Sequence, residues 1–251
     1  MHFYLPKPLH GWRAFAGEVG VIVLGVLIAL AFGQIVDAWQ WRDKVSHAEA
    51  AMRLELAEDD GPQAYGRVLI GRCLDMQLAR IHDEAGSVPA DRLRQWAASY
   101  TPPFRTWDSE AWKVVVASDT GSHLGSDRLI AWSAPYRILP TMTEGDEREA
   151  QQVIELRNGL PPTGDLTPSD VRSLRITAGQ LRLANHRFMT GSELLLARMR
   201  DLGVEVPQSI QRQLIDHARA MYGRCVTIPD LHAKPTAGRL DANLRSAALS
   251  Q

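Results

Sequence analysis

The sequence predicts an all-α protein in which an N-terminal transmembrane helix continues into a helical, bundle-like soluble domain. Three observations support this fold class. Residues 19–36 read VGVIVLGVLIALAFGQIV, an uncharged run whose one polar side chain is Gln34. Beyond it, apolar residues recur at helical spacing, and capping or breaking residues divide the chain into helix-sized segments. Strand signals are weak, because the β-branched triplet at 114–116 lies in a helix-compatible context.

The segment from Phe15 to Val36 is long enough to span a membrane. At 1.5 Å per residue it makes about 33 Å of helix, and a hydrocarbon core is about 30 Å thick. Glu18 and Asp37 lie at the ends of the uncharged run, where they can reach interfacial water. Aromatic side chains suited to the headgroup layers flank it, namely Tyr4, Trp12, Trp39 and Trp41.

Two other interpretations of this run stay open. A buried core helix is usually shorter or carries a polar stripe. A cleaved signal peptide fits Lys7 and Arg13 before the run and the A-x-A pattern at 29–31. Against cleavage, Glu18 lies ahead of the run and residues 35–36 extend it beyond the pattern. We therefore expect a retained anchor.

Basic residues and composition bear on orientation and partners. A large domain that follows a span crosses the membrane largely regardless of its charge. Arg42, Lys44 and Arg53, which follow the span, are therefore a weaker indication of orientation than Lys7 and Arg13, which precede it. We expect a short N-terminal tail inside and the large domain outside. The formal charge of −1 argues against a nucleic-acid partner.

The chain is expected to divide into four segments: a short tail (1–14), the anchor (15–38), a helical soluble domain (39–223) and a loosely ordered C-terminal tail (224–251) with a final turn at 240–249. Its two cysteines, Cys73 and Cys225, cannot make a zinc site alone. A disulfide in an exported domain and a pair of buried free thiols both stay open.

Breakers and caps predict the individual helices. The anchor helix is expected to run from about Trp12 to Glu58 and to break at Gly61–Pro62. Further helices are expected at 63–85, 89–100, 110–117, 127–135, 144–157, 167–202 and 207–222, with a turn at 119–125 and a loop at 161–165. Thr167 gives the clearest start, because Pro168 follows it and Asp170 lies three residues on.

The helix that begins at Thr167 carries a heptad seam. Its inner positions are Leu174, Ala178, Leu181, Asn185, Phe188, Ser192, Leu195, Met199 and Leu202. We expect this seam to pack within a bundle of the same chain, and an intermolecular coiled coil is the alternative.

No motif for catalysis, a cofactor or a metal ion holds up along the chain, and no catalytic, cofactor-binding or metal-binding residue is assigned. Residues 119–122 spell DTGS, the loop of aspartic proteases, but a second copy is missing and the surroundings are helical. We therefore expect Asp119 to lie in an interhelical turn. The eight histidines show no metal-ligand spacing, Ser122–His123 fits no nucleophile elbow, and no glycine-rich phosphate loop occurs.

Small residues recur every fourth position in the span, at Gly25, Ala29 and Gly33. This spacing lets two helices approach closely, and it predicts a face for self-association or for a protein partner in the bilayer.

The N-terminal region resembles an uncharacterised family of single-pass bacterial membrane proteins, described as a domain of unknown function. The matching features are Glu18, the apolar run at 23–30 and Trp39, followed by a continuing charged helix. The stretch from Glu110 to Tyr136 is similar to the helix, glycine turn and helix of that family. The resemblance implies a single-pass protein of a bacterial membrane, and it implies no activity. Combined with the orientation expected from the basic residues, it leads us to expect an inner-membrane anchor with the large domain in the periplasm.

These observations favour a membrane-anchored protein that binds or organises other proteins at the inner membrane. An exported hydrolase or other enzyme with an unrecognised site is one alternative. A signal-sensing ectodomain is the other, although an N-terminal tail of about 13 residues is too short for an output domain.

Overall fold

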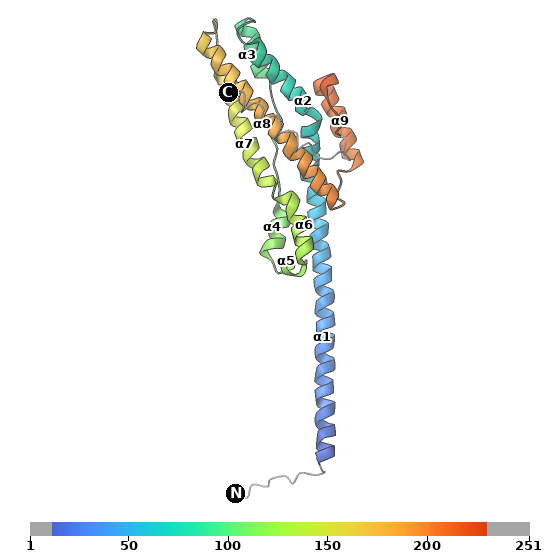
Figure 1. Ribbon diagram of the computed structural model, residues 1–251. Coiled ribbons are helices and arrows are strands. Elements are labelled where there is room, and N and C mark those ends of the chain that lie inside the picture. The colour runs from blue at the N-terminus through green and yellow to red at the C-terminus, as the bar shows by residue number, and fades with distance from the viewer. Residues whose placement is uncertain (1–11, 230–251) are drawn as a thin grey trace, which may run out of the picture. The chain divides into compact units, whose positions relative to one another are not determined.

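The computed structural model describes residues 12–229, and every regular element in this range is a helix (Figure 1). In chain order these are α1 (Trp12–Glu55), the π-helix η1 (Leu56–Asp60), α2 (Gly61–Glu84), α3 (Ala90–Ser99), α4 (Glu110–Ala117), α5 (Thr120–His123), α6 (Ser126–Tyr136), α7 (Leu139–Asn158), α8 (Pro168–Asp201), α9 (Gln208–Tyr222) and the 3-10 helix η2 (Gly223–Cys225). The predicted all-α class, with one long N-terminal apolar helix that continues into further helices, is confirmed. Of the expected tail at 1–14, residues 12–14 belong to α1, and residues 1–11 lie outside the described residues, as does the expected turn at 240–249.

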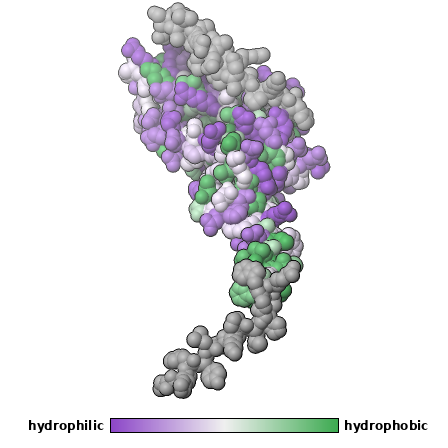
Figure 2. Space-filling model, turned by 60° about the horizontal axis from the view of Figure 1, so that its bottom comes forward, coloured by the Kyte–Doolittle hydropathy of each residue, from purple (hydrophilic) through white to green (hydrophobic). Residues whose placement is uncertain are grey.

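Two compact units divide between Glu49 and Ala50. In the first unit, every described side chain from Phe15 to Gln40 is exposed, and apolar side chains cover the surface of this part of α1 (Figure 2). Next to them, the Lys44 ammonium lies 4.3 Å from the centre of the Trp41 ring. This helix is long and apolar enough to cross a membrane.

The predicted break at Gly61–Pro62 is wrong, because the chain stays helical from α1 through η1 into α2. Pro62 lies in the first turn of α2, directly after the π turn, in which Gly61 N donates to Leu56 O. A π turn changes the register of the backbone hydrogen bonds. Pro62 has no backbone N–H to donate, and it lies where the regular hydrogen bonding of the helix is already interrupted, so the helix can continue through it.

The second unit is built around α2 and α8, with α7 beside α8 and α9 beside α2 (Figure 1). Gly71 allows the close approach of α2 and α8, since a side chain there would collide with Met189. The heptad seam of α8 is buried inside this unit from Leu174 to Met199, and Leu202 at its end is half-buried. The seam therefore forms part of the core of a single chain.

Local signals placed most helix ends correctly. The Thr167 side chain accepts from Asp170 N at 3.2 Å and the Asp170 carboxylate accepts from Thr167 N at 2.8 Å, which completes the predicted capping box. Gly203, with a φ of +65°, follows the end of α8. In contrast, α7 begins at Leu139 rather than at Glu144, because Pro140 is accommodated in its first turn.

Cys73 and Cys225 form a disulfide with a Cα–Cα distance of 5.2 Å. Beside it, Thr227 N donates to Leu69 O at 3.0 Å. The first residues of the segment expected to be loose, 224–229, are thus attached to α2, and residues 230–251 lie outside the described part.

Candidate functional site

A charged network lies at the centre of the second unit. Arg67 on α2 is fully buried, and its two terminal nitrogens donate to the Glu149 carboxylate on α7 at 2.8 and 2.6 Å. One of them also donates to Asn185 Oδ1 on α8 at 2.9 Å. Asn185 Nδ2 in turn donates to Gly71 O at 2.8 Å. Three helices are therefore joined by paired, hydrogen-bonded groups, the arrangement that a buried charge requires.

The Arg67 guanidinium also lies 4.6 Å from the centre of the Phe188 ring, a cation–π distance. Its Nε has no hydrogen-bond partner in the described part of the chain. Sequence reasoning missed Arg67 and Glu149. An available signal was the position of Arg67 in the middle of the apolar stretch AYGRVLI, where a charge needs a partner.

A second layer of polar groups surrounds this network. Trp107 Nε1 donates to Asp146 Oδ2 at 2.6 Å, and burial raises the pKa of Asp146. Arg105 is nine-tenths buried and donates to Pro103 O at 2.8 Å. Burial lowers the pKa of Arg105 to about 10, and the nearby Arg67 charge acts in the same direction. Burial also raises the pKa of Tyr100, whose hydroxyl has no partner among the described residues.

Another buried acidic group occupies the π turn. Asp60 is fully buried, and its Oδ1 accepts from Asp108 N at 3.0 Å, whereas its Oδ2 has no partner in the described part. Burial raises the pKa of Asp60 to about 8, although the hydrogen bond from Asp108 opposes the shift. Glu55 lies close by and accepts from Ala111 N at 2.8 Å. The bond from Asp108 N to Asp60 and the bond from Ala111 N to Glu55 together fix the segment that leads into α4.

An apolar groove of about 510 Å³ opens between α2, α9 and the 101–105 segment, and we call it the α2–α9 groove. Leu69, Ile70, Leu214 and Ala218 are among the residues that line it. Two exposed side chains also line it, Phe104 at 69% and Met221 at 64%. Arg105 and His217 are its basic residues, and no acidic residue lines it. The groove thus pairs an apolar surface with a buried cation.

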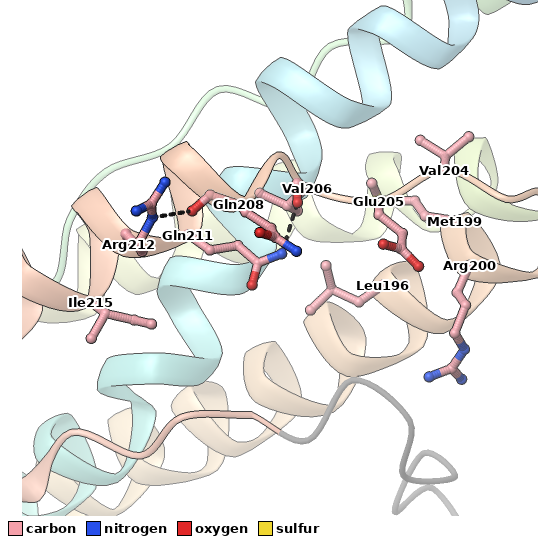
Figure 3. Close-up of a pocket in the computed structure, with 10 residues that line it drawn as sticks. All are labelled: Leu196, Met199, Arg200, Val204, Glu205, Val206, Gln208, Gln211, Arg212 and Ile215. Atoms are coloured by element: carbon pink, nitrogen blue, oxygen red, sulfur yellow. Dashed lines mark hydrogen bonds between the residues drawn. The ribbon is translucent and has the colours of Figure 1, made fainter.

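A smaller hollow of about 380 Å³ lies where α8, the 203–207 segment and α9 meet (Figure 3). The bonds drawn there are local, from Gln211 Nε2 to Val206 O at 2.7 Å and from Arg212 Nε to Gln208 O at 3.4 Å. Its side chains therefore stabilise the start of α9, and they form no converging set of catalytic groups.

Asp119 lies directly before α5, between α4 and α6, as the predicted interhelical turn requires. Its backbone oxygen accepts from Ser122 Oγ at 2.7 Å and lies 2.9 Å from His123 Nδ1. Within residues 12–229, no group of three or more potential metal ligands comes together. The absence of a catalytic role for Asp119 stays a prediction.

The small-residue face of α1 is open. A Cβ added at Gly25 or Gly33 would meet nothing within 4 Å. Self-association through Gly25, Ala29 and Gly33 stays a prediction.

No family model, curated protein or solved structure matches the chain. The candidate site consists of the buried charged network and the α2–α9 groove. Arg105 links the two, because it lines the groove and lies close enough to Arg67 for that charge to affect its pKa.

Proposed function

We propose that this chain is a membrane-anchored adaptor, whose helical domain binds another protein through the α2–α9 groove. The main evidence for this proposal is the apolar and partly exposed lining of the α2–α9 groove. Exposed apolar patches rimmed by polar residues commonly mark protein-interaction sites. Exposed aromatic and methionine side chains are the residue types that contribute most to binding at such surfaces.

The anchor places the adaptor at a membrane. Apolar side chains of α1 are exposed on every face from Phe15 to Val36, and a bilayer is the environment that makes this favourable. We expect the full chain to stay in the membrane pellet after washing with alkaline carbonate. Recovery of a soluble form that begins at Phe32 would instead identify a cleaved signal peptide.

The disulfide supports an exported domain. Disulfides persist in oxidising compartments such as the bacterial periplasm. In cells quenched with acid, Cys73 and Cys225 should resist a maleimide polymer until a reductant is added. Immediate labelling of both thiols would place the domain in the cytoplasm and contradict the proposed orientation.

The occupant that fits the α2–α9 groove is an apolar segment of a partner protein that carries an acidic side chain. The groove walls are apolar, so apolar side chains gain by burial there. Arg105 is a nine-tenths buried cation in a lining without acidic residues. Asp146 and Glu149 act on Arg105 from the buried network, and a carboxylate from the partner would add a counter-charge from the groove side.

Crosslinking tests the groove. A photoreactive phenylalanine analogue at Phe104 should yield a defined adduct in native membranes, and the same analogue at Ile176, which is 56% exposed outside the groove, should not. A synthetic peptide of the crosslinked segment should then bind the purified full chain. Met221→Glu should weaken that binding, as should the change of the peptide's acidic residue to its amide. Equal adducts from both positions, or binding that neither change affects, would refute the proposal.

A further inference from the structure

A second pocket lies between α7 and α8, and we call it the α7–α8 pocket. It has a volume of about 510 Å³, which is within the range of small-molecule sites. It shares no lining residue with the α2–α9 groove. The two hollows are therefore separate sites.

The rim of the α7–α8 pocket is basic. Arg137, Arg148 and Arg187 line it, and no acidic residue does. All three arginines are exposed, and within residues 12–229 no side-chain hydrogen bond or ion pair engages their guanidinium groups. Three arginines that converge on one hollow without a counter-charge favour an anion, because each planar guanidinium offers several donors to a carboxylate or phosphate.

A buried amide adds to this preference. Gln152 lines the pocket, and its buried Oε1 has no hydrogen-bond partner within residues 12–229. The two ends of a glutamine amide are interchangeable by rotation. Rotation would offer an N–H donor at this unpartnered position of the lining.

The floor of the pocket is apolar. Its apolar lining includes Met142, Phe188 and Leu194, together with Leu183, which is 39% exposed. Two glycines make room for it. A Cβ at Gly145 would lie 2.9 Å from Phe188 Cζ, and one at Gly191 would lie 2.6 Å from Met142 Sδ. A bare inorganic anion leaves such a floor unfilled, whereas an acyl chain covers it.

We infer that the α7–α8 pocket binds a single-chain anionic amphiphile, with its acidic head at the three arginines and its acyl chain on the apolar floor. Fatty acids and lysophospholipids with an acidic head group share this chemistry. The Phe188 ring, which lines the pocket, also contacts the Arg67 guanidinium of the buried network. A ligand in the pocket would therefore pack against a ring that belongs to that network.

The test is photocrosslinking of the full chain in phosphatidylcholine nanodiscs. The probe is a palmitic acid analogue with a diazirine in its chain. Crosslinked peptides should fall within 137–152 and 180–194. The triple variant Arg137→Gln, Arg148→Gln and Arg187→Gln should bind the probe roughly ten- to a hundredfold more weakly, because three exposed ion pairs each contribute about two- to fivefold. A matched control changes three exposed arginines outside the pocket to glutamine, namely Arg72, Arg92 and Arg172, and should bind as the wild type does.

A second variant tests the floor independently of the rim. Leu183→Glu places a carboxylate beside the acyl chain and should lower crosslinking about tenfold or more, whereas Leu183→Met should leave it unchanged. Circular dichroism checks that each variant keeps the helical content of the wild type.

Competition identifies the source of the ligand. Displacement by laurate indicates a fatty acid, and displacement by lysophosphatidylglycerol indicates a lysophospholipid; either supports the inference. Equal displacement by zwitterionic lysophosphatidylcholine, displacement by inorganic phosphate alone, or equal crosslinking of the two arginine triples would overturn it.

Discussion

The buried carboxyl group of Asp60 should make the stability of this protein decrease as the pH rises. Its pKa is about 8 in the folded chain and 3.8 in the reference state. Between these two values the unfolded chain releases a proton that the folded chain keeps, so the unfolded state is favoured progressively. The loss begins near pH 4, and it is complete above pH 8.

The change Asp60→Asn isolates this effect. Asparagine has nearly the shape of the protonated acid, and its Oδ1 can still accept from Asp108 N, as Asp60 Oδ1 does at 3.0 Å. The pKa difference sets an upper limit of about 6 kcal/mol on the benefit of the variant at high pH. We expect a gain of at least about 2 kcal/mol, because a helix turn that moves to admit water recovers part of the cost of a buried charge.

The assay is urea unfolding of the full chain in a neutral detergent at pH 5, 7 and 9, followed by tryptophan fluorescence. The free-energy difference between Asp60→Asn and the wild type should grow across the series. Glu58→Gln is the matched control, since Glu58 is exposed in the same π turn and is not among the groups that raise the pKa of Asp60, and its difference should stay constant. A constant difference for Asp60→Asn from pH 5 to 9 would refute the reasoning.

Three further predictions concern stability. Leu181→Ala should lower the free energy of unfolding by about 2–5 kcal/mol at any protein concentration, since the seam is buried within one chain. An unfolding midpoint that rises with protein concentration would indicate an intermolecular seam. Glu149→Gln should cost about 3–5 kcal/mol because it leaves the Arg67 charge unpaired, and the double variant Arg67→Met with Glu149→Leu should recover most of this loss in urea unfolding. The pair of changes Cys73→Ser and Cys225→Ser should cost about 2–5 kcal/mol, since the bond closes a loop with a sequence separation of 152; equal midpoints for the wild type with and without reductant would contradict this.

Local sequence signals determined the fold class and most helix boundaries. The apolar run of α1 needs only its length and lack of charge to be recognised. The start of α8 follows from Thr167 and Asp170, which interact within one turn of helix. These signals are readable because the interacting residues lie three or four positions apart.

Features that depend on distant partners escaped the sequence. Arg67 meets Glu149 and Asn185 across 82 and 118 residues, and nothing local pairs them. Sequence reasoning identified Asn185 as a polar member of the seam, and only the packing of α2 against α8 shows that it bonds Gly71 O. The pairing of Cys73 with Cys225 likewise depends on how α9 returns the chain to α2.

The sequence by itself therefore determined that this chain has one membrane-length helix, further helices with recognisable caps, and a seam that must be buried. Tertiary structure alone decided that the helix continues through Gly61–Pro62, that Arg67 is neutralised, and where the groove and the pocket open. The physical reason is the separation along the sequence of the groups that interact. Hydrogen bonding and hydrophobic periodicity act along a few residues of one helix, whereas charge pairing and cavity shape depend on helices that only the folded chain brings together.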